Sequence, residues 1–230
     1  MQEKALTILM NEHRAISAVL YCLKHMAEEW REGKIDPPFA LFHSIFDYMG
    51  SFPNKFHHPK EDLYLFPMVL RRAPALEETI ATLRAQHEKG DEELTSLVGL
   101  ISDMESSWDH GSGEISQTDI DSFAEAVSDY VNFERAHAKL EATDVIPKAR
   151  ETFTPEDWAR VEKVFSENDD PIFGLRPRAE FDGLFRQILS LAPAPLGYGE
   201  RKSLKKKDVS RKSDTKNNGQ RRHLLGMNWI

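Results

Sequence analysis

Four histidines occupy positions that a helical pattern otherwise gives to apolar residues. His13, His87 and His137 each stand in a row of Leu, Ile or Phe residues spaced three and four apart, and His57 lies one helical turn before Glu61. A buried imidazole or carboxylate without a partner costs several kcal/mol. A metal ion would compensate such a cluster directly, so the pattern predicts a metal site inside a helical core.

A repeat strengthens this reading. The pattern His-x3-Glu-x5-Pro occurs at residues 57–67 and again at residues 137–147. Residues four apart lie one above the other on a helix, so each segment offers one imidazole and one carboxylate to the same point. The two carboxylates are Glu61 and Glu141. With the other two histidines they form a set of four imidazoles and two carboxylates, which suits a pair of metal ions with both carboxylates bridging.

A single histidine on an apolar helix face is more often a core residue than a ligand. Here, however, four histidines fall on four different predicted helices, and two of them have a carboxylate at the matching position. The set as a whole therefore favours metal binding over core packing. Imidazole and carboxylate ligands without thiolate favour iron, manganese or zinc, and the spacing alone does not choose among them.

The elements that carry these residues are predicted to be four long amphipathic helices. Their apolar faces run over residues 6–30, 39–49, 80–104 and 120–141. Pro53 and Pro59 predict a break or kink in the second helix. Long amphipathic helices joined by short connections predict an all-α fold, an antiparallel up-down-up-down four-helix bundle.

The chain is expected to have three parts: the bundle over 1–150, a helical extension over 151–192 that packs on it, and a disordered basic tail over 193–230. Two short helices are predicted in the extension, one starting at Thr154-Pro155 and one over 178–191. The tail has 10 of the 30 Lys and Arg residues but 3 of the 38 Asp and Glu residues, a net charge of +7 that leaves −15 for residues 1–192. Its lysines are not interleaved with aromatic residues, so neither nucleic acid nor a membrane is predicted as a partner.

Composition excludes several classes of protein. No run approaches the roughly 18 apolar residues of a membrane span, and the polar N-terminus does not resemble a cleaved signal. The single cysteine, Cys22, excludes an intramolecular disulfide and any site built from several cysteines. A reducing cytoplasm is therefore the expected compartment.

Four segments carry a resemblance to a known family: NEHRAI, FHHPKEDLYLFP, AQHEKG and AHAKLEATDVIP. Together, and in this order over about residues 4–150, they resemble the hemerythrin-like (HHE cation-binding) proteins of bacteria. The resemblance implies two non-haem irons inside the bundle, bridged by oxygen and two carboxylates. On this basis the terminal ligands would be His13, His57, His87 and His137, and the bridges would be Glu61 and Glu141.

The chain departs from the oxygen-carrying hemerythrins by one ligand. Those proteins supply five histidines, two of them four residues apart on the third helix, whereas here Asp91 follows His87 by four residues. His58 is one candidate for the missing ligand. It points about 100° away from His57 on a regular helix, so a place beside the ligands or at the surface is expected. Glu134 is the other candidate, and its alternative is a solvated glutamate near the helix boundary.

Four histidines, two bridging carboxylates and a bridging hydroxide would give each iron about five donors, and iron prefers six. The expected function is therefore the binding or sensing of a small ligand (oxygen, nitric oxide or peroxide), or of iron itself. The alternatives are a di-iron enzyme with peroxidase- or oxidase-like activity, or an iron donor for iron–sulfur cluster repair. Apolar residues around the site favour binding over turnover. The donor role is disfavoured because the chain begins at its first helix, without the cysteine-bearing extension of such relatives. The sequence predicts no oligomeric state.

Overall fold

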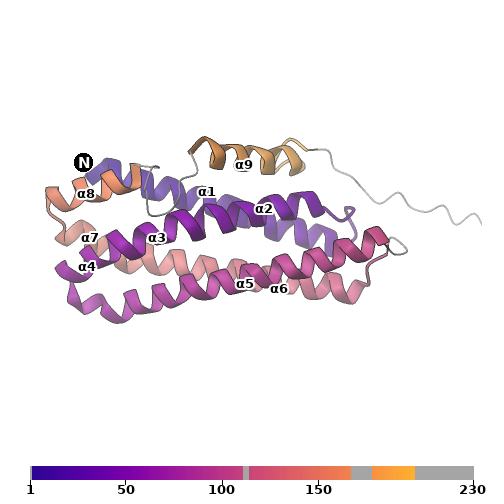
Figure 1. The fold of residues 1–230 in the computed structure, drawn as a ribbon, viewed down its shortest axis with the longest axis horizontal. Coiled ribbons are helices and arrows are strands. Elements are labelled where there is room, and N and C mark those ends of the chain that lie inside the picture. Colours follow the sequence, from indigo (N-terminus) through magenta and orange to yellow (C-terminus); the bar gives the residue numbers. More distant parts are fainter. Residues whose placement is uncertain (1, 111–113, 167–177, 200–230) are drawn as a thin grey trace, which may run out of the picture.

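The computed structural model describes residues 2–110, 114–166 and 178–199. Helices form most of this described part, which contains one isolated β-bridge, between Pro193 and Gly199, and no strand. Four long helical rods lie side by side along the long axis of the molecule (Figure 1). They are α1 (Gln2–Arg31); α2 (Phe39–Ser51), α3 (His58–Lys60) and α4 (Phe66–Arg72) in one line; α5 (Glu77–His110); and α6 (Gln117–Leu140) followed by α7 (Ile146–Thr152). The predicted all-α fold is confirmed.

The apolar rows of the rods face inwards and form two clusters. Helix α1 contacts α2 and α6, and α5 contacts the same two helices. One cluster surrounds Trp30, Phe42 and Phe123, whose ring centroids lie 5.1–6.0 Å apart. The second cluster, which includes Leu9 and Phe66, lies further along the rods. Buried histidines and carboxylates fall between the two clusters on three of the rods, and the partly buried His13 lies at the same level on α1, so a polar layer divides the core.

Three π-helical turns interrupt the α-helical hydrogen bonding of the rods. They span Pro53–His57, Glu61–Leu65 and Glu141–Val145. Each ends two residues before a proline, and the prolines are Pro59, Pro67 and Pro147. A proline has no N–H, and its ring clashes with the carbonyl four residues earlier in an α-helix. In all three cases that carbonyl lies within the π turn, where the wider i→i+5 bonding accommodates the proline.

The second rod is therefore irregular but continuous. The sequence predicted a break or kink at Pro53 and Pro59, and no break is present. Phe52, at the junction, keeps helical dihedral angles (φ −82°, ψ −61°). The π turns accommodate the prolines without ending the helix, so the chain keeps its direction.

The C-terminal extension adds α8 (Pro155–Ser166), which contacts α1, and α9 (Arg178–Leu191), which contacts α2. Both helices fall where the sequence predicted them. Asp157 anchors the start of α8, because its carboxylate accepts hydrogen bonds from the Thr154 backbone N–H at 3.0 Å and from Arg72 Nε at 2.8 Å. Phe165 on α8 packs into the second apolar cluster.

The chain turns back after α9. The backbone N–H of Tyr198 donates to the carbonyl of Leu189 at 2.7 Å, and that of Gly199 donates to Ala192 at 2.8 Å. The predicted tail thus begins with seven residues, 193–199, that have a defined structure. Residues 200–230, on which the rest of the predicted disordered tail falls, lie outside the described residues.

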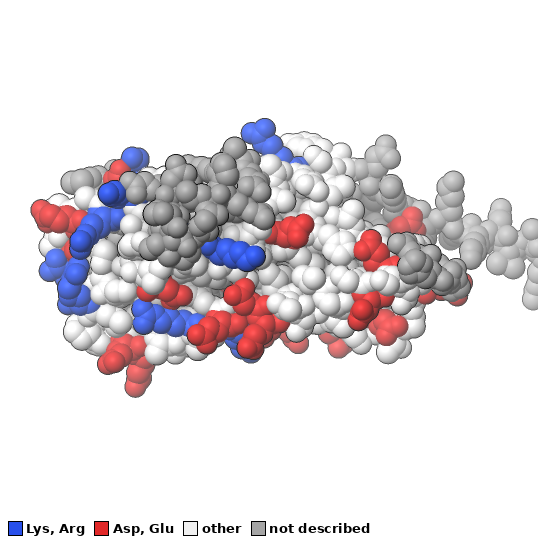
Figure 2. Space-filling model, in the orientation of Figure 1, with Lys and Arg blue, Asp and Glu red and all other residues white. Residues whose placement is uncertain are grey.

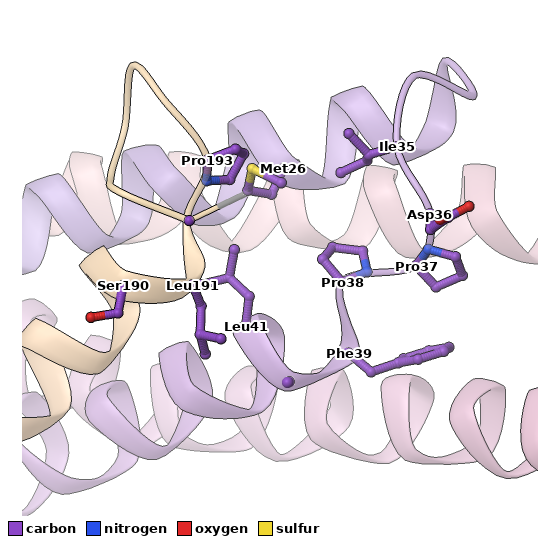
Figure 3. Close-up of a pocket in the computed structure, with 12 residues that line it drawn as sticks. Met26, Ile35, Asp36, Pro37, Pro38, Phe39, Leu41, Ser190, Leu191 and Pro193 are labelled. Atoms are coloured by element: carbon purple, nitrogen blue, oxygen red, sulfur yellow. The ribbon is translucent and has the colours of Figure 1, made fainter. Parts of the chain in front are cut away.

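An apolar cavity of about 270 Å³ lies where the α1–α2 connection meets the end of α9, and Met26, Leu41 and Leu191 are among its lining residues (Figure 3). Among the described residues that line it, Asp36 is the one with an ionisable side chain, so these residues form no cluster of metal donors. On the face seen in Figure 2, acidic side chains lie along the lower edge, and Lys and Arg gather at the end near α4, α7 and α8. None of the helices in the described ranges is long and apolar enough to cross a membrane.

Candidate metal centre

The first group of possible metal donors joins α1 to the second rod. His13 and His57 present their Nε2 atoms to each other at 3.0 Å. The Oε1 atom of Glu61 lies 3.7 Å from His13 Nε2 and 3.4 Å from His57 Nε2. These donor atoms lie within 4.8 Å of one another, so one metal ion could contact all three residues.

The second group joins α5 to α6. His87 and His137 bring their Nε2 atoms to 3.3 Å. Glu61 Oε2 lies 3.6 Å from His87 Nε2, and Glu141 Oε1 lies 3.5 Å from His137 Nε2. These four residues are all buried, and their donor atoms also lie within 4.8 Å of one another.

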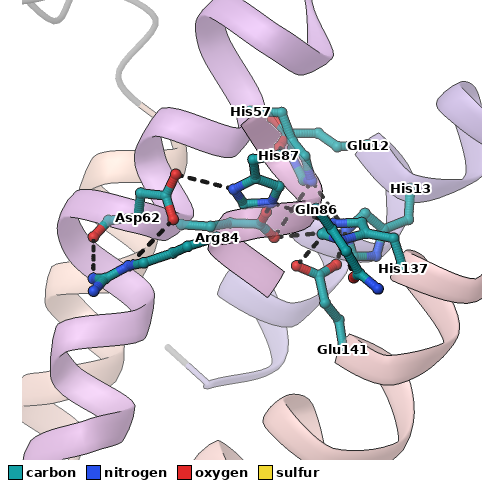
Figure 4. A network of polar contacts seen from close by, with 10 residues as sticks. Glu12, His13, His57, Asp62, Arg84, Gln86, His87, His137 and Glu141 are labelled. Atoms are coloured by element: carbon teal, nitrogen blue, oxygen red, sulfur yellow. Dashed lines mark hydrogen bonds and ion pairs between the residues drawn. The ribbon is translucent and has the colours of Figure 1, made fainter. Parts of the chain in front are cut away.

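Two carboxylates, those of Glu61 and Glu141, connect the groups, and Figure 4 shows Glu141 beside His13 and His137. Glu61 directs Oε1 towards His13 and His57, and Oε2 towards His87. Glu141 directs Oε1 towards His137, and its Oε2 lies 3.2 Å from His13 Nε2. Each carboxylate therefore reaches both groups, which is the arrangement of a bridge between two metal ions. The structure brings together all six residues that the sequence selected, and their role as ligands remains a prediction.

His58 belongs to the same centre. Its ring stacks on that of His87 with a centroid distance of 4.1 Å, it lies 5.5 Å from the ring of His137, and the residue is 6% exposed. The donor atoms of these three histidines lie within 4.8 Å of one another. Its burial excludes a place at the surface, whereas a place beside the ligands stays a prediction. The ring of His57 faces His13 and that of His58 faces His87, so both neighbours lie in the interior although they point in different directions.

Three of the rings are fixed by acceptors at Nδ1. His57 Nδ1 lies 2.9 Å from Glu12 Oε2, His87 Nδ1 lies 2.9 Å from Asp62 Oδ2, and His137 Nδ1 lies 3.1 Å from Gln86 Oε1. A ring that donates Nδ1–H to such an acceptor turns a bare Nε2 towards the centre, as a metal ligand must. These acceptors cannot be recognised from the sequence, because a polar residue beside a ligand resembles a solvent-facing one. Their one signal is that each directly adjoins His13, Glu61 or His87 in the chain.

A buried lysine completes the surroundings of His57. Lys60 is 1% exposed, and its Nζ lies 3.7 Å from Glu12 Oε1 and 3.9 Å from the centroid of the Phe56 ring. Phe165 of α8 lies on another side, 5.2 Å from the same ammonium group. The acceptor of His57 is thus a carboxylate that is itself close to a cation, and the extension helps to close this end of the centre.

The charges of the centre favour a cation. Burial lowers the pKa of His58 well below its usual range and that of His137 to about 4, so both rings are neutral. Burial would also lower the pKa of His13, but the neighbouring carboxylates of Glu141 and Glu61 raise it to about 10. Burial and the charge of Glu141 raise the pKa of Glu61 well above its usual range. A positive charge between the two carboxylates, here on the His13 ring, relieves their repulsion.

The residues present fit a pair of metal ions. All four carboxylate oxygens of Glu61 and Glu141 are buried, and none makes a hydrogen bond of ordinary geometry within the described residues. Buried polar atoms are nearly always satisfied, so these oxygens require another partner. Five imidazoles and two carboxylates without thiolate form a donor set suited to iron, manganese or zinc.

Glu134 lies near the centre but outside the donor groups found among the described residues. It is 6% exposed, so the alternative of a solvated glutamate is wrong. Together with His13, His58 and His137 it lines a cavity of about 110 Å³ beside the centre. The helical period places Glu134 one turn before His137 on the same face, and Gly90 of the facing helix leaves room for its carboxyl group.

Comparison with known proteins gives one match. Residues 4–149 match the family model described as hemerythrin HHE cation binding domain. No curated protein and no solved structure matches the chain. The matched range covers well over half of the chain and contains every residue of the three donor groups.

Proposed function

The chain belongs to the hemerythrin HHE cation-binding family, and from this premise we propose that its centre binds two non-haem iron ions and, at them, a small ligand such as oxygen, nitric oxide or peroxide. One ion would be held by His13 and His57, and the other by His58, His87 and His137. Glu61 and Glu141 would bridge the two ions, and Glu134 is not among the proposed ligands.

One observation carries this proposal: two buried carboxylates each extend one oxygen to either histidine group, and none of the four oxygens is hydrogen-bonded within the described residues. Five histidines and two carboxylates leave the ion on the His13 side with one imidazole fewer than the other. An iron pair there would supply electrons and an exchangeable coordination position.

The protein's own residues would hold and shield this pair. Glu12, Asp62 and Gln86 fix the ring orientations, and the apolar clusters on either side exclude water from the layer between them. The proposal includes the antiparallel up-down-up-down bundle, supported by the contacts of each rod with two others. It also includes a reducing cytoplasmic location, which the single buried thiol of Cys22 suits.

The test is metal content. Protein produced with ample iron should contain close to two irons per chain by elemental analysis. His137→Ala should lose at least one equivalent, since no neighbour on α6 replaces its Nε2. His25→Ala is the matched control, because His25 is partly exposed and its contact is with Glu29 on its own helix. A folded wild-type protein without metal, or a His137→Ala variant with both ions, would overturn the proposal.

A second candidate is a di-iron enzyme with peroxidase-like activity, which the buried carboxyl group of Glu134 in the adjoining cavity favours. Stopped-flow absorption of the reduced protein mixed with oxygen, and separately with peroxide, distinguishes the two functions. A persistent oxygen adduct supports binding, whereas rapid reoxidation with repeated turnover of peroxide supports the enzyme.

A further inference from the structure

Glu134 is a buried acid in the wall of the cavity beside the centre. It lies on α6 one turn before His137, and the cavity of about 110 Å³ is also lined by His13, His57 and His58. No Lys, Arg or His forms an ion pair with Glu134 in the part of the chain that the structure describes. A carboxyl group without a paired cation in such a place is expensive to ionise.

The helix opposite makes room for this carboxyl group. A Cβ atom on Gly90 of α5 would lie 2.8 Å from Glu134 Oε1, closer than any ordinary contact. Gly90 is a buried position in the apolar row of α5, and glycine in a helix interior is less favourable than alanine. The missing side chain is thus what admits the carboxyl group into the interface between α5 and α6.

The surroundings of Glu134 are acidic. Burial first, and then the charges of Glu93, Glu141 and Asp91, raise its pKa to about 7. Tyr130, one turn earlier on α6, is 1% exposed, and its hydroxyl group interacts with the carboxyl group of Glu134 and partly opposes this rise in the pKa. Glu134 therefore holds a proton more readily than a surface glutamate does, and that proton is available to whatever enters the cavity.

We propose that the carboxyl O–H of Glu134 donates a hydrogen bond to a small anion, of the class of azide or hydroperoxide, that binds at the metal centre from this cavity. This inference rests on the proposed function and adds to it a protein group that recognises the ligand. A protonated carboxyl group attracts an anion through its O–H, whereas an ionised one would repel it. Hydrogen bonds to charged groups are the stronger ones, which gives this single contact a measurable effect.

The experiment is an azide titration of the iron-loaded protein, followed by the visible absorption bands. Glu134→Leu removes the donor at similar volume and should weaken azide binding about tenfold, or about 1.4 kcal/mol. Glu134→Gln keeps an N–H donor and should stay within about threefold of the wild type. Gly90→Ala should weaken azide binding as Glu134→Leu does, because its methyl group displaces the carboxyl group of Glu134. Alanine has a higher helix propensity than glycine, so this change should not destabilise α5 itself.

Metal content and thermal melting are measured on every variant, and infrared spectra of the wild type should contain a protonated carboxylic acid band that Glu134→Gln lacks. A wild-type protein that contains no iron contradicts the proposed function. An iron-loaded Glu134→Leu variant that binds azide as tightly as the wild type overturns the role of Glu134 alone. Equal losses of azide affinity in Glu134→Gln and Glu134→Leu also overturn it. An azide affinity like that of the wild type in Gly90→Ala contradicts the claim that Gly90 makes room for the carboxyl group.

Discussion

The imidazole ring of His58 lies parallel to that of His87, with centroids 4.1 Å apart and planes 9° from parallel. The two rings come from neighbouring rods, and a third ring, His137, approaches them from α6. We propose that His58 provides the fifth histidine of the centre, since Asp91 occupies the position four residues after His87 on α5. In place of a ligand, Asp91 accepts a hydrogen bond from the side chain of Asn54.

His58→Ala should weaken iron retention and strengthen azide binding, because it removes one imidazole and opens a coordination position. The magnitude expected is at least tenfold in azide affinity, with part of the iron lost on dialysis against a chelator. His43→Ala serves as the control, since His43 lies away from the centre and pairs with Glu105 at 2.6 Å. Azide affinity and iron content within threefold of the wild type would show that His58 is not a ligand.

Glu12→Ala should lower iron affinity by about 10- to 100-fold, as loss of an acceptor behind a ligand commonly does. The change leaves the Nδ1 of His57 without its partner and the ring free to turn. Competition with a coloured chelator measures the affinity. Glu88→Ala is the matched control, an exposed glutamate that adjoins the candidate ligand His87 in the chain. Equal affinities in the two variants would contradict the role of Glu12.

Asp157→Asn should lower the free energy of unfolding by about 1 kcal/mol at pH 7, because the charged hydrogen bonds to Thr154 and Arg72 are weakened. Burial opposes the charge of Asp157, but these partners lower its pKa below the usual range of an aspartate. A lowered folded-state pKa stabilises the protein above the unfolded value, and that stabilisation is lost as the pH falls through the folded value. Chemical denaturation of the metal-free proteins should therefore give a smaller difference in the free energy of unfolding between Asp157→Asn and the wild type at pH 3.5 than at pH 7. Glu156→Gln, one residue earlier and exposed, should show no difference at either pH.

A chain that ends at Gly199 should keep its iron content and melting temperature, since no apolar periodicity follows in the sequence. A chain that ends at Ala192 should melt about 2–4 °C lower, because it loses the backbone hydrogen bonds that Tyr198 and Gly199 donate to the end of α9. Differential scanning calorimetry of the two truncated proteins makes the comparison. A large loss in the longer one would mean that Leu224, Leu225, Met227 and Trp229 contribute to the fold.

The sequence predicted the rods and six residues of the centre because both follow from helical periodicity. A histidine in an inward row of apolar residues is predicted to be buried. The His-x3-Glu-x5-Pro pattern, which recurs 80 positions later, predicts which residues lie at the same level of the bundle. Neither argument needs knowledge of how the rods meet. The start of α8 at Thr154-Pro155 was predictable for the same local reason.

The sequence is uninformative where the outcome depends on a second rod. The surface alternative for His58 is wrong because α5 and α6 lie on that side of its rod, which periodicity along one rod does not show. The inward position of Glu134 follows from the helical period, but the space for its carboxyl group depends on Gly90 of another helix. The acceptors behind the histidines were missed for a similar reason: nothing local distinguishes Glu12 from an exposed glutamate.

The π turns following Glu61 and Glu141 also determine how this chain can change in length. Each turn takes up one residue more than a regular helical turn would, without rotating the residues after it. Loss of one residue between Glu61 and Pro67 would therefore leave Phe66, Val69 and the residues beyond facing as they do now. The restored α-helix would, however, bring the ring of Pro67 against the carbonyl four residues earlier. A chain shortened at either turn would thus need a different residue in place of Pro67 or Pro147.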